Sequence, residues 1–390
     1  MKTISIFFFI LFLISCRDEG SSEPETELYK YSLPVEINDG WVTSGLKEVN
    51  LNEEKLTEMV NYIDEETNHK IHGILIVKDS KLVFEKYFKG FTFDANYVQS
   101  VGDLIQYGID TLHYMASVSK SITSLLLGIA IDKGAKIDIN ERLVNYYPEY
   151  TNVLSDTKAT ITIGHLLTMT AGLSWDESSY SYGDSRNDVT QLFIQPDAIK
   201  FILQKPLQSL PGNEFNYNSG YTNILADILQ KKTNTQFLDF ADQFLFRPLE
   251  IESYKWDNLN DSLIFASGGL YLSPRSLAKI GNLFFTEGEW NQNKIVSNQW
   301  LNQSSINYVS RGFNNFSDGY GLHWWKYTFN TYNQTFDSFF AAGWGEQFLF
   351  IFPELNMLAV ITGGYYYDLV QISPHSIVRD YILPSTIIQN

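Results

Sequence analysis

The chain has 390 residues, of which 44% are hydrophobic and 15% aromatic, so it can bury a large core in one or two structural units. Its formal net charge of −17 repels phosphate backbones and anionic lipid headgroups, which argues against nucleic acid as a partner.

The first fifteen residues have the pattern of an export signal. A positive charge precedes an apolar run over residues 4–14, which is too short to span a bilayer as a mature helix. The run ends in Leu-Ile-Ser-Cys at residues 13–16, which resembles the lipobox of bacterial lipoproteins, and Cys16 is the only cysteine. The resemblance implies cleavage before Cys16 and attachment of diacylglycerol to its thiol. An ordinary secretory signal with an incidental cysteine is the alternative.

The segment after Cys16 is predicted to be a tether. Residues 17–26 are polar, acidic and poor in large apolar groups, so they cannot repay the entropy of becoming ordered. We therefore divide the chain into a signal peptide (1–15), a tether with an N-terminal extension (16–50) and one domain (51–390). The expected location is outside the cytoplasm, with a lipid anchor in a bacterial-type envelope membrane, on its periplasmic or cell-surface side.

Apolar periodicity and turn residues predict helices and strands along the domain. In chain order they are a helix at 54–66, strands at 71–77 and 82–88, helices at 117–134, 219–232 and 274–286, strands at 335–342, 347–352 and 356–362, and a helix at 374–383. Strands at both ends with helices between them predict an α+β fold. Its antiparallel sheet would combine the N-terminal hairpin with the C-terminal meander, flanked by helices, and a mainly helical region would be inserted at about 135–265.

A serine with a lysine three residues later is the first candidate for chemistry. A serine hydroxyl needs a neighbouring base to become a good nucleophile, and residues three apart share one face of a helix. Burial lowers the pKa of a lysine and makes a neutral amine available, while the first N–H groups of the helix can stabilise an oxyanion. The pattern occurs four times, at Ser44/Lys47, Ser117/Lys120, Ser155/Lys158 and Ser276/Lys279.

Context selects Ser117 as the nucleophile and Lys120 as its base. The first and third pairs lie in polar stretches without helical periodicity, where the lysine would stay solvated, and the fourth has its lysine on a mixed polar face. Only Ser117 opens a helix that is apolar nearly all round, over residues 122–131, and such a helix removes the lysine from water. A capping serine followed by a surface lysine is the alternative.

The flanking residues carry a family resemblance. Residues 114–121, Tyr-Met-Ala-Ser-Val-Ser-Lys-Ser, resemble the first motif of the serine β-lactamase-like superfamily, which has the β-lactamase/transpeptidase-like fold and includes class C β-lactamases, penicillin-binding carboxypeptidases and related esterases and amide hydrolases. Pro-Gly followed by Tyr217-Asn218-Ser219 is similar to the second motif, Tyr-x-Asn, with Ser219 in place of the Asn. The resemblance implies that Tyr217 is a base or proton relay, and that Ser219 contacts substrate. A nearby ammonium on Lys120 would favour the phenolate of Tyr217.

The third motif of that family, Lys-Thr-Gly, corresponds to Ala341-Ala342-Gly343. Its Lys and Thr recognise the substrate carboxylate in true β-lactamases, so their absence argues against efficient penicillin hydrolysis. The resemblance implies that the N–H of Trp344 joins that of Ser117 in an oxyanion hole, and that Gly343 allows close approach of the substrate. Segments 162–173, 267–271 and 319–325 also resemble the family, so the likeness covers roughly residues 55–385.

Several aromatic residues and two histidines are further candidates for the site. Trp175 and Trp325 are candidates for an aromatic substrate pocket, together with Tyr180, Tyr182 and residues 365–367. His165 lies in an apolar helical stretch and His323 beside two tryptophans, so both are predicted to be structural. Neither a metal nor an organic cofactor is implied.

These motifs lead to one expected activity and two alternatives. The expected protein is a serine hydrolase that forms an acyl-enzyme with a small-molecule or peptide-like ester or amide. The alternatives are a penicillin-binding-like receptor with slow or no turnover, and a D-Ala-D-Ala carboxypeptidase. The sequence does not indicate an oligomeric state.

Overall fold

The computed structural model describes residues 28–94, 101–310, 316–366 and 369–387. The predicted signal peptide, Cys16 and the tether at 17–26 lie outside the described residues, so those three predictions stay predictions.

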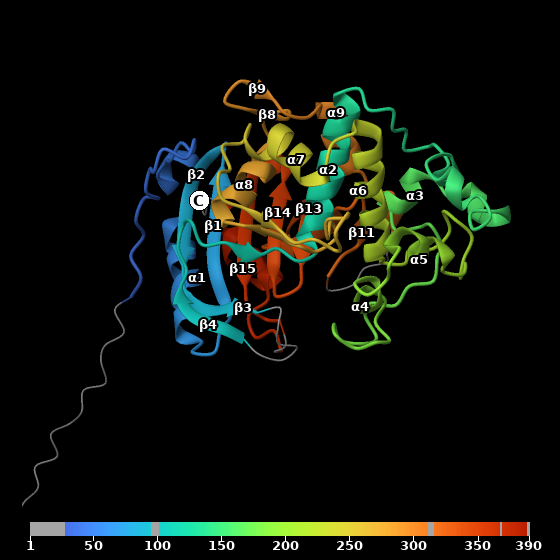
Figure 1. Cartoon of the computed structure of the whole chain (residues 1–390). Coiled ribbons are helices and arrows are strands. Elements are labelled where there is room, and N and C mark those ends of the chain that lie inside the picture. Colours follow the sequence, from blue (N-terminus) through green and yellow to red (C-terminus); the bar gives the residue numbers. More distant parts are fainter. Residues whose placement is uncertain (1–27, 95–100, 311–315, 367–368, 388–390) are drawn as a thin grey trace, which may run out of the picture.

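An antiparallel sheet of eight strands forms the centre of the molecule (Figure 1). Its order is β10-β11-β12-β13-β14-β15-β1-β2, so the first hairpin of the chain joins the last meander through the β1–β15 pair, in which Ile74 faces Ile361. The strands are β1 (Ile71–Lys78), β2 (Lys81–Tyr87), β10 (Val309–Ser310), β11 (Gly319–Tyr320), β12 (Trp325–Thr331), β13 (Gln334–Gly343), β14 (Gln347–Phe352) and β15 (Met357–Gly363). The predicted α+β fold and its sheet are confirmed, while β10, β11 and β12 were not predicted.

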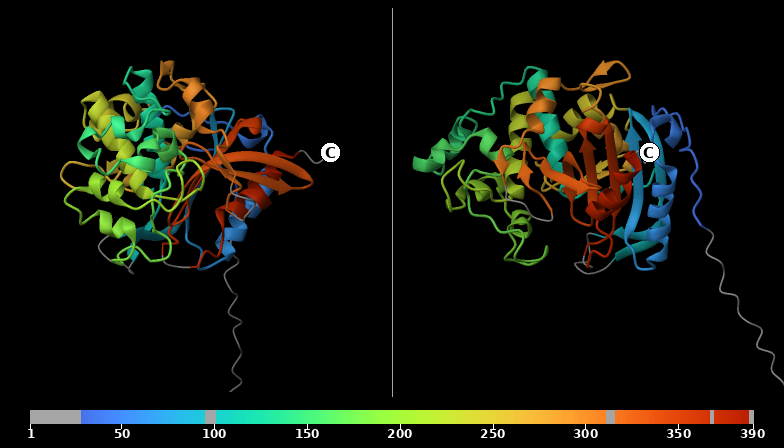
Figure 2. Two further views of the ribbon diagram at one scale, coloured as in Figure 1. Left: turned by 90° about the vertical axis from the view of Figure 1, so that its right-hand side faces the viewer. Right: turned by 180° about the vertical axis from the view of Figure 1, so that it is seen from behind.

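Helices cover both faces of this sheet. The longer ones are α1 (Glu53–Glu65), α2 (Val118–Asp132), α6 (Ser219–Thr233) and α8 (Pro274–Asn282). Helices α8 and α2 contact strands of one face, and α1 packs with the C-terminal helical segment on the other face (Figure 2). Four predicted helices therefore exist, although α8 ends four residues before its predicted end. The predicted helix at 374–383 is α10 (Pro374–Ile377) continued by a π-helical turn (Val378–Ile382).

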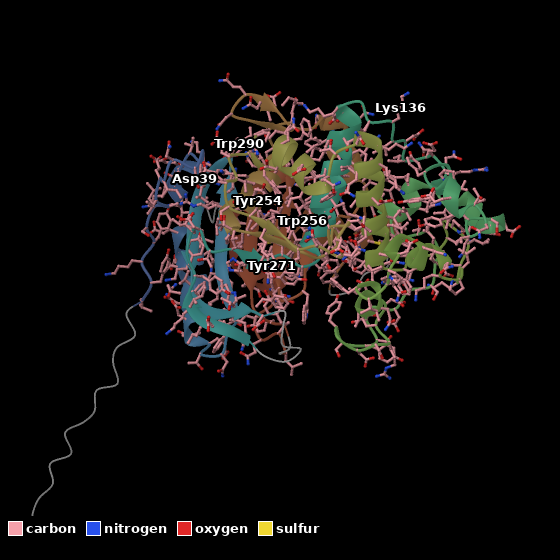
Figure 3. The ribbon with its side chains drawn as sticks, viewed as in Figure 1. Asp39, Lys136, Tyr254, Trp256, Tyr271 and Trp290 are labelled. Atoms are coloured by element: carbon pink, nitrogen blue, oxygen red, sulfur yellow. The ribbon has the colours of Figure 1, made fainter. Side chains whose placement is uncertain are left out.

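The middle of the chain forms a mainly helical region beside the sheet (Figure 1). It contains α3 (Ile163–Leu167), α4 (Asp188–Leu192), α5 (Ala198–Gln204) and α6, and α7 (Phe237–Ala241) follows α6 in the chain. Three small sheets complete the described chain: β3 (Lys89–Phe93) with β4 (Val101–Gln106), β5 (His113–Tyr114) with β7 (Leu270–Leu272) and β6 (Lys255–Trp256), and β8 (Glu289–Trp290) with β9 (Asn293–Lys294). Trp256 and Tyr271 are carried by the second of these (Figure 3).

Shorter helical segments connect these elements. They are 3₁₀ helices at Leu46–Val49, Leu143–Asn145, Pro148–Tyr150, Asp156–Thr160, Pro353–Leu355 and Pro384–Thr386, and a π-helical turn at Asp242–Phe246. In the part of the chain that the structure describes, no helix has the length and apolarity needed to cross a bilayer.

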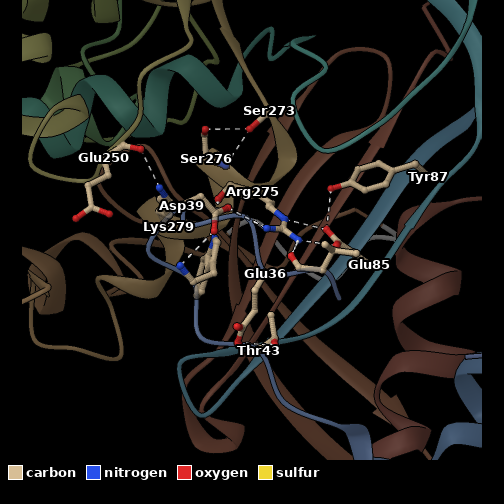
Figure 4. A network of polar contacts seen from close by, with 12 residues as sticks. Glu36, Asp39, Thr43, Glu85, Tyr87, Glu250, Ser273, Arg275, Ser276 and Lys279 are labelled. Carbon is tan, nitrogen blue, oxygen red and sulfur yellow. Dashed lines mark hydrogen bonds and ion pairs between the residues drawn. The ribbon is translucent and has the colours of Figure 1, made fainter. Parts of the chain in front are cut away.

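A buried arginine fastens the N-terminal extension to the domain (Figure 4). Arg275, on α8, donates two hydrogen bonds to Glu85 of β2, one to Asp39 and one to the carbonyl of Val35. Only 2% of the Arg275 side chain is exposed. Because the charge is met by two carboxylates, this ion cluster can remain out of water and hold residues 35–39 against the sheet.

Candidate active site

The candidate nucleophile lies at the start of α2, in a turn made tight by its neighbours. Ser117 is the N-cap residue of α2, and the preceding Ala116 has φ +44°, a backbone conformation that alanine seldom adopts. Such strain persists only where the surroundings impose it. The hydroxyl of Ser119 donates to the carbonyl of Ala116 at 2.6 Å and accepts from the N–H of Leu270 at 3.3 Å, which fixes the turn to β7.

Lys120 has the environment that lowers the pKa of an amine. Its side chain is 1% exposed, and its Nζ donates to the Oγ of Ser117 and to the carbonyl of Ser267, both at 2.9 Å. Burial lowers the pKa of Lys120 to about 8, and the negative charge of Glu177 opposes this shift. Both acceptors are neutral, so a substantial fraction of the amine is unprotonated near pH 8 and can take the proton of Ser117.

The carbonyl of Ser267 is held in place from α6. Asn223 donates through Nδ2 to the Oγ of Ser267 at 3.1 Å, and its Oδ1 accepts from the N–H of Ala266 at 3.0 Å. Asn223 is buried, so these bonds are shielded from water. Asn223 was not predicted from the sequence, because a single asparagine inside a helix forms no motif.

Tyr217 lies against both residues but is not a phenolate. The Nζ of Lys120 is 4.8 Å from the centre of its ring, and the ring stacks on Trp325 at 5.5 Å. Burial raises the pKa of Tyr217 well above its usual value, and a hydrogen bond with Ser117 lowers it by less. The expectation that Lys120 would favour the phenolate was therefore wrong, because loss of solvation is the largest influence on the pKa of Tyr217 and raises it. Lys120 is the group poised to act as base, and Tyr217 is a neutral hydroxyl that can pass a proton.

A carboxylate that was not predicted from the sequence, that of Glu177, binds Ser219. The two oxygens of Glu177 accept from the N–H and the Oγ of Ser219 at 2.8 and 2.9 Å, and Trp175 donates its Nε1 to the same carboxylate at 2.6 Å. Glu177 therefore occupies the N-terminus of α6, where backbone N–H groups attract negative charge. Ser219 lines a cavity beside Ser117, whereas Trp175 is buried and lines neither of the two cavities described below. Residues 177 and 219 are 42 positions apart, so no local sequence pattern could predict this contact.

Gly343 brings the end of β13 against the nucleophile turn. A methyl group at this position would lie 2.2 Å from the carbonyl oxygen of Met115 and 3.2 Å from the nitrogen of Ser117. The space left by the missing side chain is thus filled by the protein, which differs from the expectation that it admits substrate. Trp344, the next residue, lines the same cavities as Ser117, and its N–H stays a predicted member of the oxyanion hole.

Two cavities meet at Ser117, with Tyr182 and Trp344 lining both. The larger has a volume of about 500 Å³ and includes the rings of Phe93, Tyr114 and Phe265. The smaller has a volume of about 260 Å³ and is lined by Tyr217 and Trp325 among others. Trp325 is therefore placed as predicted for a pocket residue.

Tyr180 and the described residues of 365–367, by contrast, line neither cavity. Tyr367 lies outside the described residues.

His165 and His323 have structural roles, as predicted. A ring nitrogen of His323 contacts the Oγ1 of Thr222 at 3.0 Å, and burial lowers the pKa of His323 to about 3. His165 accepts from the N–H of Thr162 at 3.2 Å in a capping box of α3. Neither lines the cavities beside Ser117.

Two of the rejected Ser-x-x-Lys pairs differ from expectation. Lys158 was predicted to stay solvated, but it is partly buried and donates to the carbonyl of Leu203 at 2.8 Å, and Lys279, predicted to lie on a mixed polar face, is only 2% exposed. Lys47 is exposed, as predicted. Lys279 instead donates to the carbonyl of Glu250 at 2.9 Å. A carbonyl acceptor allowed a lysine to be buried on a helix whose sequence looked amphipathic.

With this geometry in view, comparison with known proteins identifies the family. The family model described as Beta-lactamase matches residues 59–363. The chain belongs to the beta-lactamase family. This confirms the predicted superfamily and agrees with the order of motifs along the chain.

Two curated proteins share part of this sequence. The 6-aminohexanoate-dimer hydrolase of Paenarthrobacter ureafaciens is 24% identical over 276 residues, which cover 65% of this chain and 63% of that relative. Protein flp of Staphylococcus aureus strain MW2 is 23% identical over 188 residues, which cover 48% of this chain and 35% of that relative. The chain thus spans less than two thirds of the length of these two curated relatives.

Two solved structures share the fold. A family VIII carboxylesterase has a TM-score of 0.65 at 14% identity, with 85% of this chain and 96% of the other covered. A beta-lactamase/D-alanine carboxypeptidase from Pseudomonas syringae has a TM-score of 0.59 at 16% identity, with 85% and 98% covered. At these identities the likeness concerns the fold.

Proposed function

We propose that this protein is a serine hydrolase that cleaves an ester or amide through an acyl-enzyme on Ser117. The observation that carries the proposal is the 2.9 Å contact between the Nζ of Lys120 and the Oγ of Ser117, made by an amine whose pKa burial lowers to about 8. A buried amine next to a hydroxyl is the arrangement that activates a serine.

The reaction proceeds in two balanced steps. In the first, the Oγ of Ser117 attacks the carbonyl carbon while its proton passes to neutral Lys120, and the N–H groups of Ser117 and Trp344 stabilise the oxyanion. Tyr217 then donates its hydroxyl proton to the leaving atom and regains one from the ammonium of Lys120. In the second step water attacks the acyl-enzyme and loses a proton to Lys120. The bond between the acyl carbon and the Oγ of Ser117 then breaks to release the acid, and the ammonium of Lys120 returns the proton to that Oγ.

The substrate is proposed to be a small ester or amide rather than a penicillin. Ala341 and Ala342 stand where the resembling β-lactamases have side chains that hold the substrate carboxylate, and alanine methyl groups cannot do so. Two of the relatives reported above are a dimer hydrolase and a carboxylesterase by name, which supports ester or amide chemistry.

Labelling of Ser117 tests this proposal. A fluorophosphonate probe should modify Ser117 in the intact protein, and Ser117→Ala should lose both the label and hydrolysis of small p-nitrophenyl esters. Ser276→Ala is the matched control and should keep both. Full ester hydrolysis by the Ser117 variant, or labelling of a different serine, would show the assignment to be wrong.

A penicillin-binding-like receptor is the second candidate. Ser219 replaces the asparagine of the second motif and is engaged by Glu177, so the contact that this asparagine would make to an acyl group is changed. A burst of product without steady turnover would favour this candidate. Release of free D-alanine from a short donor peptide would instead favour a D-Ala-D-Ala carboxypeptidase.

We also propose that the mature protein is held to an envelope membrane through lipid on Cys16. The support is the apolar run that ends at this single cysteine. Cys16→Ser should move the protein from the membrane fraction to the soluble fraction in a bacterial host. Unchanged membrane association of the Cys16 variant would contradict the proposal.

A further inference from the structure

The smaller cavity beside Ser117 contains a carboxylate with no catalytic assignment. Glu346 follows β13 in the turn to β14 and has φ +67°, so the backbone holds it in an uncommon conformation. It lines the cavity together with Ser117 and Tyr217. Its side chain is only partly exposed, and no hydrogen bond or ion pair of Glu346 is present within the described residues.

The other side chains around this cavity are apolar or aromatic. They are Phe316, Trp325, Ala342 and Phe348, with Tyr182, Tyr217 and Trp344 at the side of Ser117. Among the described lining residues, none is a lysine, arginine or histidine. A carboxylate among aromatic rings in a partly dehydrated pocket attracts an organic cation, because the ring faces and the carboxylate are both negative.

The position of Tyr217 tells which part of the substrate enters this cavity. The proton donor must reach the leaving atom, so the leaving group lies on the side of Tyr217. Tyr217 lines the smaller cavity and not the larger one. The larger, aromatic cavity of about 500 Å³ therefore receives the acyl group, and the cavity of about 260 Å³ receives the alcohol or amine that departs.

We propose that Glu346 selects substrates whose leaving group carries a positive charge, such as an amino alcohol or a diamine with a second, protonated nitrogen. This inference rests on the proposed function and names the substrate class of that same site. The leaving atom takes its proton from Tyr217, and the charged nitrogen remains paired with Glu346 until the product departs. An anionic leaving group is rejected, because Glu346 repels it and Ala342 offers no donor in return.

Two esters of the same acid test the proposal. Butyrylcholine and 3,3-dimethylbutyl butyrate have leaving groups of equal shape, but only the first is cationic at every pH. Burial raises the pKa of Glu346 to about 7, so assays at pH 8.5 keep its carboxylate ionised. We expect the wild-type kcat/KM to be about tenfold higher for butyrylcholine, since a partly buried ion pair is worth a factor of this order.

Glu346→Gln should bring that ratio to about one while changing the kcat/KM of the neutral ester by less than about threefold. Glu354→Gln, an exposed glutamate in the turn after β14, is the matched control and should leave the ratio unchanged. Equal losses for both esters in the Glu346 variant, or no preference in the wild type, would overturn the proposal.

A binding measurement separates this proposal from the proposed function. If Ser117 hydrolyses neither ester, the esterase proposal fails, and Glu346 is then judged by calorimetric binding of choline and 3,3-dimethyl-1-butanol. A preference for choline that Glu346→Gln abolishes supports the cation site without any turnover. Equal binding of the two alcohols by the wild type contradicts it.

Discussion

The molecule contains two buried helices with the same Ser-x-x-Lys spacing near their start, and only in one of them does the lysine contact the serine. On α2 the Nζ of Lys120 reaches the Oγ of Ser117 at 2.9 Å. On α8 the Nζ of Lys279 turns away to the carbonyl of Glu250, while Ser276 hydrogen-bonds to Ser273 (Figure 4). Burial lowers the pKa of both lysines, so a lowered pKa does not by itself distinguish a base from a structural lysine.

The difference comes from what surrounds each serine. Ser117 lies at the junction of two cavities, in a tight turn where Ala116 has a positive φ and Gly343 approaches the backbone closely. Ser276 lines neither of these cavities. Its helix, α8, carries Arg275, whose positive charge is paired with the carboxylates of Asp39 and Glu85. In the proposed mechanism the buried amine of Lys120 must be able to lose its proton. Arg275, which holds the N-terminal extension, instead keeps its positive charge when buried.

Removing the two lysines separately gives the largest contrast. Lys120→Met should lower kcat/KM for a p-nitrophenyl ester by roughly 10³-fold or more, because Ser117 loses its base. Lys279→Met should leave kcat/KM nearly unchanged, since its amine contacts the carbonyl of Glu250 and the ring of Trp290, and neither residue lines the cavities beside Ser117. Steady-state kinetics of the purified variants measures both. Similar losses in the two variants would mean that the Lys120 variant acts through folding rather than chemistry.

Breaking the Arg275 cluster should affect stability and spare the chemistry. Arg275→Met leaves the carboxylates of Glu85 and Asp39 without their partner, which should cost about 3–5 kcal/mol in the free energy of unfolding. Urea denaturation measures the loss. Arg379→Met breaks an exposed pair with Asp380 and should cost less than about 1 kcal/mol. Equal costs would show that burial of the cluster adds nothing.

Gly343→Ala tests whether strand β13 positions the nucleophile turn. The added methyl group would collide with the carbonyl of Met115, so β13 and Ser117 must move apart. We expect kcat/KM to fall by roughly 10²-fold, because a displacement of about 1 Å lowers activity by about this factor in other active sites. Gly108→Ala is the control, because its methyl group would meet nothing closer than 3.9 Å. Unaltered kinetics in the Gly343 variant would refute the positioning role.

Local sequence patterns predicted most of the fold and the central residues of the site. The apolar run after Ser117 predicted a helix that buries Lys120, and the alternation of apolar residues predicted β1, β2, β13, β14 and β15. Strands β10 and β11 are two residues each, too short to leave a periodic pattern. The resemblance to family motifs placed Tyr217 and Trp344, which neither composition nor spacing would have selected.

The remaining parts depend on contacts between distant segments. Glu177 meets Ser219 across 42 residues, and Arg275 meets Glu85 across 190, so no window of sequence contains both partners. The protonation state of Tyr217 was predicted wrongly for a related reason. Its pKa depends on how completely the fold buries the hydroxyl, and the sequence showed only the neighbouring amine.

The pH dependence gives the smallest effect and ties Glu177 to Lys120. Because the neutral amine of Lys120 is the active form, kcat/KM for an uncharged ester should rise with pH to a plateau, with a midpoint near pH 8. The negative charge of Glu177 favours the ammonium and raises this pKa, so Glu177→Gln should move the midpoint to lower pH by less than about one unit.

An uncharged ester is used so that titration of Glu346 has no cation to release. Glu214→Gln removes an exposed charge and should leave the midpoint in place. A midpoint that rises in the Glu177 variant would mean that Glu177 acts by positioning Ser219 rather than through its charge.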